Sequence, residues 1–327
     1  MKTHAIRIHK AGGPEELRCE EVDIATPGPT DALVRFNAVG VNFIDIYHRT
    51  GLYPVPGFPS GIGMEGAGVV EAVGSEVRDL TVGDRVACAG GPIGAYAEKY
   101  LVPAERLVRV PKQIADDTAA AMMLKGMTAQ YLLRRTYKVK RGDAILFHAA
   151  AGGVGLIACQ WAKHLGATVI GTAGSDEKAE LARAHGCDHV IVYTRERVSA
   201  RVREITNGTG VPVVYDSVGA ATFDDSLDCL APFGLMVSFG NASGPVPPFN
   251  LATLSMKGSL YITRPTLMTY TAKRDDLVAT ANELFDVVGA GKVKVEVRQR
   301  YPLSQAAQAH RDLEGRQTTG SIVLLPG

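Results

Sequence analysis

The sequence predicts an α/β protein with two domains, the first built from short strands and the second from alternating strands and helices. Up to about residue 110, strand-like runs are separated by turns rich in Gly and Pro, which is typical of a barrel or sandwich. From Asp143 onward, apolar runs of strand length alternate with helical patterns, which indicates a doubly wound parallel sheet. A chain of 327 residues also suits two domains better than one.

Short strands are expected throughout the N-terminal region. Strand-like runs cover residues 3–10, 17–22, 32–41, 66–73, 95–102 and 106–110, and a turn at 82–86 leads into a further strand. The composition changes after Pro111. Residues 116–135 are rich in Ala, Met and Leu, and they predict a helix in two pieces around Gly126 that connects the domains.

The second half of the chain supplies the alternating elements. Strands are expected at 144–148, 168–172, 189–193, 212–216, 234–239 and 258–263, with helices at about 153–165, 176–185, 196–206 and 222–231. A long helix at 273–289, a strand at 292–298, a helix at 303–314 and a last strand at 320–325 follow Pro265. These last elements are too few for a third domain, so we expect them to pack on the first two.

The composition is that of a globular protein with a substantial core. Hydrophobic residues make up 46% of the chain and charged residues 21%. The formal net charge of +1 arises from 35 basic and 34 acidic residues spread along the chain, which argues against nucleic acid or an anionic membrane as the main partner. The N-terminal stretch MKTHAIRIHK is unlike a signal peptide, and no apolar run is long enough to span a bilayer. We therefore expect a cytoplasmic protein.

The cysteines and histidines do not suggest a disulfide framework or a metal site. The five cysteines are odd in number, and none forms a C-x-x-C pair. His185 and His189 have a spacing that could bind a metal on a helix, but Gly186 between them is expected to end that helix.

A glycine-rich turn joins the first strand of the alternating region to its helix. The residues from Ala150 to Gly155 read A-x-G-x-x-G, which is the dinucleotide fingerprint with Ala in place of its first Gly. Gly152 would let the backbone approach a pyrophosphate, and Gly155 would let the helix pack closely on the strand. The helix N-terminus would offer N–H groups to the phosphates. We predict a dinucleotide site here, and the alternative is an ordinary turn between strand and helix.

The end of the second strand indicates which dinucleotide is bound. NAD-binding folds place an Asp or Glu there, whereas this chain reads GTAGS. Gly174, the Ser175 hydroxyl and the Lys178 ammonium would instead accommodate a ribose 2′-phosphate, and Tyr193 could donate its hydroxyl to the same group. We therefore expect NADPH. The alternative is that Ser175 only caps a helix and Lys178 is a solvated surface residue, and the nearby Asp176 weakens the argument for a phosphate.

Several longer motifs give the chain a family resemblance. They are NFID at 42–45, GMEGAGVV at 63–70, LFHAAAGGVGLIACQWAK at 146–163, VYDSV at 214–218, SLDCL at 226–230, VSFGN at 237–241, TRP at 263–265 and AH at 309–310. The chain resembles the zinc-independent, ζ-crystallin-like quinone reductases of the medium-chain dehydrogenase/reductase superfamily over nearly its whole length. The resemblance implies a GroES-like β-barrel catalytic domain at 1–125 and 265–327, a central Rossmann domain at 126–264, and a homodimer formed through Rossmann-domain sheet edges.

The ligands that distinguish zinc enzymes of this superfamily are missing. Zinc alcohol dehydrogenases carry a Cys in the region of residues 42–45 and a His-Glu pair in the glycine-rich segment. This chain has Asn42 and Asp45 in the first region, and Met64 precedes Glu65 in the second. We therefore expect no metal. Without a Lewis acid, a quinone or conjugated enone suits the site better than an alcohol, because it accepts hydride readily.

The resemblance also implies roles for single residues. The expected cofactor-binding residues are Asn42, Thr128, Gly152, Gly153, Val154, Gly174, Ser175, Lys178, Tyr193, Ser217, Phe239, Gly240, Asn241, Arg264 and Arg316. The expected catalytic residues are Asn42, Asp45, Tyr47 and Tyr53. The rings of Tyr47 and Tyr53 could stack on a planar quinone, or both could pack in the barrel. Phe239 could equally be a core residue.

The expected reaction is hydride transfer from NADPH to a quinone without a metal, for which proximity and orientation matter most. No dedicated acid is expected, because water or a Tyr could protonate the product. An NADPH-dependent enone or alkenal reductase is one alternative. A non-catalytic, crystallin-like protein that binds NADPH or RNA is the other, and the near-zero net charge counts against RNA.

Overall fold

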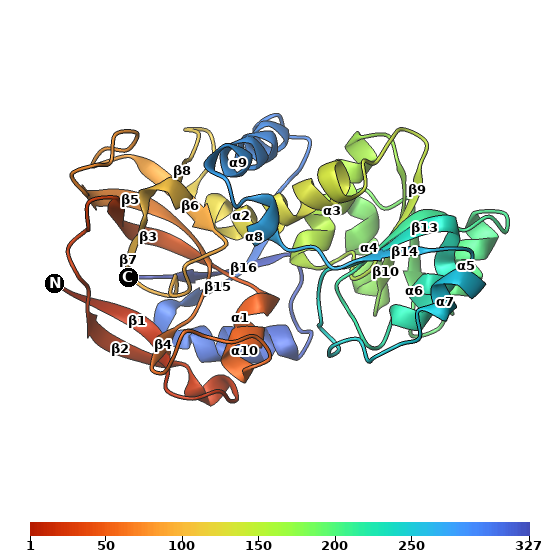
Figure 1. The fold of residues 1–327 in the computed structure, drawn as a ribbon, viewed down its shortest axis with the longest axis horizontal. Coiled ribbons are helices and arrows are strands. Elements are labelled where there is room, and N and C mark those ends of the chain that lie inside the picture. The colour runs from red at the N-terminus through yellow and green to blue at the C-terminus, as the bar shows by residue number, and fades with distance from the viewer. The chain divides into compact units, whose positions relative to one another are not determined.

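The computed structural model describes residues 1–327 and divides the chain into two compact units (Figure 1). The first unit comprises Met1–Met127, Thr271–Phe285 and Val295–Gly327, and the second comprises Thr128–Tyr270 and Asp286–Lys294. None of the helices is both long and apolar enough to cross a membrane. The α/β fold class predicted from the sequence is confirmed.

The first unit is built mainly from short strands. They are β1 (Lys2–Ile8), β2 (Arg18–Asp23), β3 (Asp31–Val41), β4 (Ser60–Gly61), β5 (Glu65–Val73), β6 (Arg85–Ala89), β7 (Lys99–Pro103), β8 (Val108–Arg109), β15 (Val297–Pro302) and β16 (Ser321–Leu325). One sheet has the order β15-β16-β3-β5-β6-β8, with β7 also paired to β3, and a smaller sheet has the order β2-β1-β4. The C-terminal strand β16 pairs antiparallel with β3, so the end of the chain completes a sheet begun near its start.

Helices of the first unit and its borders are α1 (Phe43–Thr50), α2 (Asp116–Tyr131), α9 (Arg274–Gly289) and α10 (Ala306–Glu314), with short 3-10 turns at Pro14–Glu16, Ala104–Arg106 and Leu303–Gln305. The core of this unit follows from alternation along β3, where Ala32, Val34 and Phe36 are buried on one side. The Phe36 ring stacks on Tyr100 with centroids 5.4 Å apart. Ile322 of β16 belongs to the same apolar cluster.

The second unit is a doubly wound parallel sheet. Its strands are β9 (Ala144–Phe147), β10 (Thr168–Ala173), β11 (His189–Val192), β12 (Val211–Asp216), β13 (Leu230–Ser238) and β14 (Tyr261–Thr263). They lie in the order β11-β10-β9-β12-β13-β14, and every pairing is parallel. The order reverses between β9 and β12, and ligands of such sheets bind at the carboxyl ends of the strands beside this reversal.

The helices of this unit are α3 (Gly153–His164), α4 (Asp176–Ala184), α5 (Val198–Ile205), α6 (Phe223–Cys229), α7 (Ala252–Met256) and α8 (Leu267–Tyr270), and a π-helix covers Leu132–Thr136. The strands are near-continuous apolar runs, as expected for a parallel sheet covered on both faces. Leu146, Ile170 and Val214 from three neighbouring strands lie in one buried cluster with Leu227 of α6.

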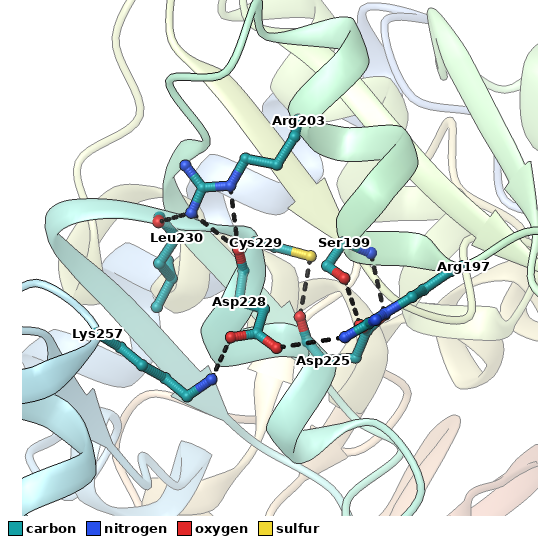
Figure 2. Close-up of polar contacts among 8 residues, drawn as sticks. All are labelled: Arg197, Ser199, Arg203, Asp225, Asp228, Cys229, Leu230 and Lys257. Atoms are coloured by element: carbon teal, nitrogen blue, oxygen red, sulfur yellow. Dashed lines mark hydrogen bonds and ion pairs between the residues drawn. The ribbon is translucent and has the colours of Figure 1, made fainter.

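A polar network ties α5 and α6 to β13 and to the segment after α7 (Figure 2). The Arg203 guanidinium donates to the carbonyl oxygens of Asp228 and Leu230, both at 2.8 Å. The Asp228 carboxylate pairs with Lys257 and lies 3.7 Å from the Arg197 guanidinium. These contacts satisfy carbonyl groups at the C-terminal end of α6, where a helix leaves acceptors without intrahelical partners.

Three predictions about elements were wrong. The helix at 116–135 is not divided at Gly126, because α2 continues through that residue. A Cβ atom on Gly126 would lie 2.5 Å from a methyl group of Leu284, so the glycine allows close packing and does not break the helix. The strand expected at 292–298 is β15 at Val297–Pro302, and the run at 95–102 becomes a strand only from Lys99. The sequence pattern also did not predict α1, although this helix carries two of the candidate catalytic residues, Asp45 and Tyr47.

Candidate functional site

The glycine-rich turn between β9 and α3 has the geometry that a dinucleotide site needs. Gly152 is the extended N-cap residue of α3. A Cβ atom on Gly155 would lie 2.5 Å from the carbonyl oxygen of Ala149 and 2.6 Å from that of Ala150, so only glycine allows α3 to pack this closely on the turn. Gly153 and Val154 form the first turn of α3, where backbone N–H groups lack intrahelical acceptors.

A buried histidine connects the carboxyl ends of the central strands. His148 follows β9, with Nδ1 3.1 Å from the Thr172 hydroxyl and Nε2 2.9 Å from the Ser226 hydroxyl. The Ser226 hydroxyl in turn donates to Asp216 Oδ2 at 2.8 Å. Burial lowers the pKa of His148, which favours the neutral ring. His148 was not among the residues predicted from the sequence.

The buried Asp216 shapes the turn after β12. One carboxylate oxygen accepts the N–H groups of Val218 and Gly219 at 2.7 and 3.1 Å, and the other accepts the Thr222 and Ser226 hydroxyls at 2.7 and 2.8 Å. Every oxygen of the carboxylate therefore has two donors, as a buried charge requires. Ser217 lies inside this turn.

The ends of β12, β13 and β14 bring together five of the predicted cofactor residues. A Cβ atom on Gly240 would lie 2.4 Å from the carbonyl oxygen of Ser217, so the two turns are in close contact. The Arg264 guanidinium donates to the Gly240 carbonyl at 2.9 Å, and with its amide turned, Asn241 accepts from the same guanidinium at 3.0 Å. The Phe239 ring lies 5.8 Å from that of Phe147.

The end of β10 brings together the residues predicted for a 2′-phosphate. A Cβ atom on Gly174 would lie 2.6 Å from the Tyr193 hydroxyl oxygen, so the phenol lies over this glycine. Ser175 does cap α4, since its hydroxyl accepts the Lys178 N–H at 3.3 Å. Lys178 itself lies in the first turn of α4.

Asp176, which weakened the sequence argument, has a cationic partner. The Arg195 guanidinium donates to both of its carboxylate oxygens, at 2.7 and 2.6 Å. The Arg195 contact lowers the pKa of Asp176, so the carboxylate is ionised and its charge is offset locally. Arg195 was not among the predicted residues, and an isolated Arg in the sequence carried no signal of this pairing.

The remaining predicted cofactor residues are distributed over both units. Thr128 is the first residue of the second unit and lies within α2, whereas Asn42 and Arg316 belong to the first unit. Arg316 follows α10 with a positive φ of 56°.

A cluster of buried polar side chains surrounds the start of α1 in the first unit. Asn42 is the N-cap residue, and its N–H donates to Asp45 Oδ2 at 2.8 Å. Its side-chain amide donates to Glu65 Oε2 at 2.7 Å. Glu65 is fully buried and also accepts the Leu124 N–H at 2.7 Å and the Lys125 ammonium at 3.1 Å. The structure therefore brings the candidates Asn42 and Asp45 together.

Lys125 is a member of this cluster that was not predicted from the sequence. Its side chain is 7% exposed, and the Glu65 carboxylate is its ion-pair partner. A Lys inside the apolar run MMLKGM was the available signal, because a buried ammonium is costly unless it is paired.

Burial raises the pKa of Asp45 to about 7. Hydrogen bonds from the Tyr96 hydroxyl and the Asn42 N–H oppose this rise, as does the charge of Lys125, whereas the charge of Glu65 adds to it. The Oδ1 atom of Asp45 is buried and has no hydrogen-bond partner.

Tyr47 and Tyr53, the other two catalytic candidates, contact each other. Their ring centroids are 5.2 Å apart in an edge-to-face arrangement, and the Tyr53 N–H donates to the Tyr47 carbonyl at 2.9 Å. The ring of His48 lies 5.9 Å from that of Tyr53. Tyr47 is buried and Tyr53 is half-buried. No group of three or more His, Cys, Asp or Glu side chains is arranged to hold a metal ion.

Replacing Lys125 should test the charge balance of this cluster. Lys125→Met is expected to lower the free energy of unfolding by roughly 3–5 kcal/mol, because the buried Glu65 carboxylate loses its opposite charge. Urea denaturation followed by circular dichroism measures the loss. The exposed Lys112 is the control, and Lys112→Met should change stability by less than about 0.5 kcal/mol. Equal effects of the two substitutions would contradict the assignment.

Comparison with known proteins agrees with both units. The alcohol dehydrogenase GroES-like domain matches residues 28–112, and the zinc-binding dehydrogenase family matches residues 153–283. The chain is 58% identical to a quinone oxidoreductase of Pseudomonas aeruginosa over 98% of this chain and 99% of that protein. It is 51% identical to a 2-haloacrylate reductase of a Burkholderia species, with 98% of each chain covered.

Solved structures give the same result. The crystal structure of Escherichia coli quinone oxidoreductase complexed with NADPH superimposes with a TM-score of 0.97 at 50% identity, covering 99% of this chain and 100% of that one. A Pseudomonas syringae quinone oxidoreductase gives a TM-score of 0.98 at 53% identity, with the same coverage. With the strand order of the second unit and the residues at its strand ends, these similarities show that the chain belongs to the quinone oxidoreductases of the medium-chain dehydrogenase/reductase superfamily.

Proposed function

We propose that this protein reduces quinones with NADPH, by hydride transfer that does not use a metal ion. The observation that carries the proposal is full-length similarity of 50–58% identity to proteins named quinone oxidoreductase, one of them solved with NADPH. The local geometry supports it, because the two regions predicted to hold a dinucleotide contain groups that would suit phosphates: the N-terminus of α3, and Lys178 with the Tyr193 hydroxyl at the end of β10.

The residues at the strand ends of the second unit fit NADPH. The turn at Gly152 to Gly155 and the first N–H groups of α3 would receive the pyrophosphate. Lys178 and the Tyr193 hydroxyl, which lies over Gly174, would bind the 2′-phosphate. Arg195 offsets the charge of Asp176 next to this position and so reduces the repulsion of a phosphate.

We also propose that the other predicted cofactor residues bind NADPH. Five of these residues follow the carboxyl ends of β12, β13 and β14, which is the end of the strands where such sheets bind ligands; they are Ser217, Phe239, Gly240, Asn241 and Arg264. Thr128 and Asn42 are proposed for the nicotinamide side, and Arg316 for a phosphate.

Zinc does not fit the residues of the first unit. Glu65 is already paired with Lys125 and bonded to Asn42, and the residue before it is Met64. None of the clustered side chains supplies the three ligands that a catalytic zinc ion needs. The name of the matched zinc-binding dehydrogenase family therefore describes relatives whose ligand set this chain lacks.

On the substrate side, the paired rings of Tyr47 and Tyr53 suit a planar acceptor. NADPH supplies the hydride when it is bound, and the protein positions the acceptor and excludes water. A quinone needs no Lewis acid, because the negative charge formed on reduction is delocalised. Asn42 and Asp45 are proposed as catalytic residues of this side.

A second candidate activity is reduction of an activated carbon–carbon double bond. The 2-haloacrylate reductase that is 51% identical to this chain favours it, since that identity equals or exceeds those of several quinone oxidoreductases. Both activities use the same hydride donor and differ in the acceptor.

We also propose that the protein is a homodimer through the edge strand β14. Four apolar side chains of β13, β14 and the α7 segment are exposed, namely Phe233, Tyr261, Leu251 and Met256, with exposures of 70, 60, 71 and 78%. The Phe233 N–H donates to the Gly258 carbonyl at 2.8 Å, which holds the end of α7 beside β13. An exposed edge strand flanked by apolar side chains is typical of an interface, and a second copy would cover it. A cytoplasmic location remains a prediction from the sequence.

An acceptor panel tests the reaction. NADPH oxidation, followed by absorbance, should be faster with 1,4-benzoquinone and ortho-quinones than with conjugated enones or 2-haloacrylates. A higher kcat/KM for 2-haloacrylate would favour the second activity. No oxidation with any of these acceptors would reject both.

Lys178→Ala tests the choice of coenzyme. The loss of one charge-assisted contact should raise the KM for NADPH by roughly 10- to 100-fold and leave that for NADH nearly unchanged. Lys140→Ala, at another exposed Lys, is the matched control and should change neither value. An equal change for both coenzymes would contradict the 2′-phosphate assignment.

The oligomeric state tests the role of the β14 edge. Met256→Asp combined with Phe233→Asp should convert a dimer into a monomer in light scattering after size exclusion, because two charges would be buried unpaired. Val82→Asp, at an exposed position of the first unit, should leave the dimer intact. A monomeric wild-type protein would reject the proposal.

A further inference from the structure

A chain of buried polar side chains leads from the surface of the first unit to Asp45. Glu314, 35% exposed, forms a bidentate pair with the Arg49 guanidinium at 2.7 and 2.9 Å. Arg49 Nη1 lies 3.1 Å from His310 Nδ1, and His310 Nε2 lies 3.1 Å from the Tyr96 hydroxyl. Tyr96 donates to Asp45 Oδ2 at 2.9 Å. Each member from Arg49 to Asp45 is at most 1% exposed.

The chemistry of Arg49 sets the direction of every hydrogen bond in this chain. A guanidinium only donates, so His310 Nδ1 must accept and carries no proton. A neutral imidazole then has its proton on Nε2, which donates to the Tyr96 oxygen. Burial and the charge of Arg49 lower the pKa of His310 to about 3, which keeps the ring neutral. The Tyr96 proton is therefore directed to Asp45.

The chain also determines where a proton on Asp45 can reside. Its Oδ2 atom accepts both the Tyr96 hydroxyl and the Asn42 N–H, whereas Oδ1 is buried without a partner. Protonation at Oδ1 keeps both hydrogen bonds, whereas protonation at Oδ2 would disrupt them. The carboxyl group thus holds the same position beside Asn42 in both charge states.

We propose that His310 is a positioning residue for the reaction. Arg49 fixes His310 as the Nε2–H tautomer, so every hydrogen bond from His310 through Tyr96 to Asp45 has one direction. This chain holds Asp45 beside Asn42, and it leaves Oδ1 as the atom of Asp45 that binds a proton. Arg49 cannot release a proton, so this chain orients Asp45 and does not carry protons from the surface.

Protonation of Asp45 changes the net charge of the cluster around it, and this charge affects catalysis. Besides Tyr96, the groups that face Asp45 are Lys125 and Glu65, whose charges cancel as an ion pair. Ionised Asp45 leaves this cluster with a net negative charge, and protonated Asp45 leaves it neutral. Hydride addition to a quinone creates an anion, which a neutral cluster disfavours less. This consequence rests on the proposed quinone reduction, whereas the hydrogen-bond chain does not.

The tautomer of His310 is the first test, and it uses the unmodified protein. Nitrogen-15 NMR of the histidine-labelled full chain, assigned by comparison with His310→Gln, should show a protonated Nε2 and an unprotonated Nδ1 at neutral pH. The opposite tautomer, or an imidazolium, would overturn the proposal.

The second test measures the titration of Asp45 by the infrared C=O band of its acid form, identified as the band lost in Asp45→Asn. Tyr96→Phe removes a donor to the carboxylate and should move the titration to higher pH by roughly one unit. His310→Leu should move it in the same direction by less, because the Tyr96 hydroxyl loses the donor that polarises it. His310→Gln can accept from Arg49 and donate to Tyr96, so it should restore the wild-type value.

A shift to lower pH in His310→Leu would overturn the proposal. In a reversed chain, Tyr96 donates to His310, and removal of the ring would free its hydroxyl for Asp45. If His310→Leu does not fold, the NMR result and Tyr96→Phe decide the question.

Turnover supplies a separate readout. The kcat for quinone should fall as the pH rises through the titration of Asp45, the midpoint should move upward in Tyr96→Phe, and Asp45→Asn should remove this inflection. An inflection that survives in Asp45→Asn would overturn the link to catalysis. An inactive wild-type protein would reject the proposed function, and the NMR and infrared results would still decide the hydrogen-bond chain.

Discussion

The second unit depends on one buried carboxylate, that of Asp216 at the end of β12. Its four hydrogen bonds form the turn that carries Ser217 and connect, through the Ser226 hydroxyl, to His148 after β9. His148 in turn contacts Thr172 of β10. The carboxyl ends of three neighbouring strands are therefore held by one polar network, and a doubly wound sheet binds its ligand at these ends. Removing one member would leave buried polar atoms without partners and loosen all three ends.

A buried carboxylate, that of Glu65, has a similar connecting role in the first unit. Glu65 lies where it can fix Asn42 through its amide and α2 through the Leu124 N–H and the Lys125 ammonium. One carboxylate thus joins the N-terminal end of α1 to a helix more than 70 residues away in the sequence. The positive charge that faces Glu65 in this cluster is the Lys125 ammonium, 3.1 Å from Oε2.

Much of the architecture followed from the sequence, because periodicity and glycine turns are local signals. The sheet of the second unit and the strands of the first were predicted for this reason, as was the A-x-G-x-x-G turn. Gly126 was wrongly predicted to divide the helix, because the side chain that requires a glycine there is Leu284, which is far away in the sequence. The same reason explains why four functional groups were not predicted: His148, Lys125, Arg195 and His310. The hydrogen-bond or ion-pair partner of each lies at least 19 residues away in the sequence.

The ion pair of Asp176 and Arg195 has a consequence for solution conditions. Both side chains are largely exposed, at 71 and 59%, so dissolved salt screens their attraction far more than that of a buried pair. The same salt would screen the proposed attraction of Lys178 for a 2′-phosphate. If the proposed 2′-phosphate site is correct, ionic strength acts on both parts of the charge pattern at the end of β10, and the preference between the two coenzymes depends on the salt concentration as well as on the protein.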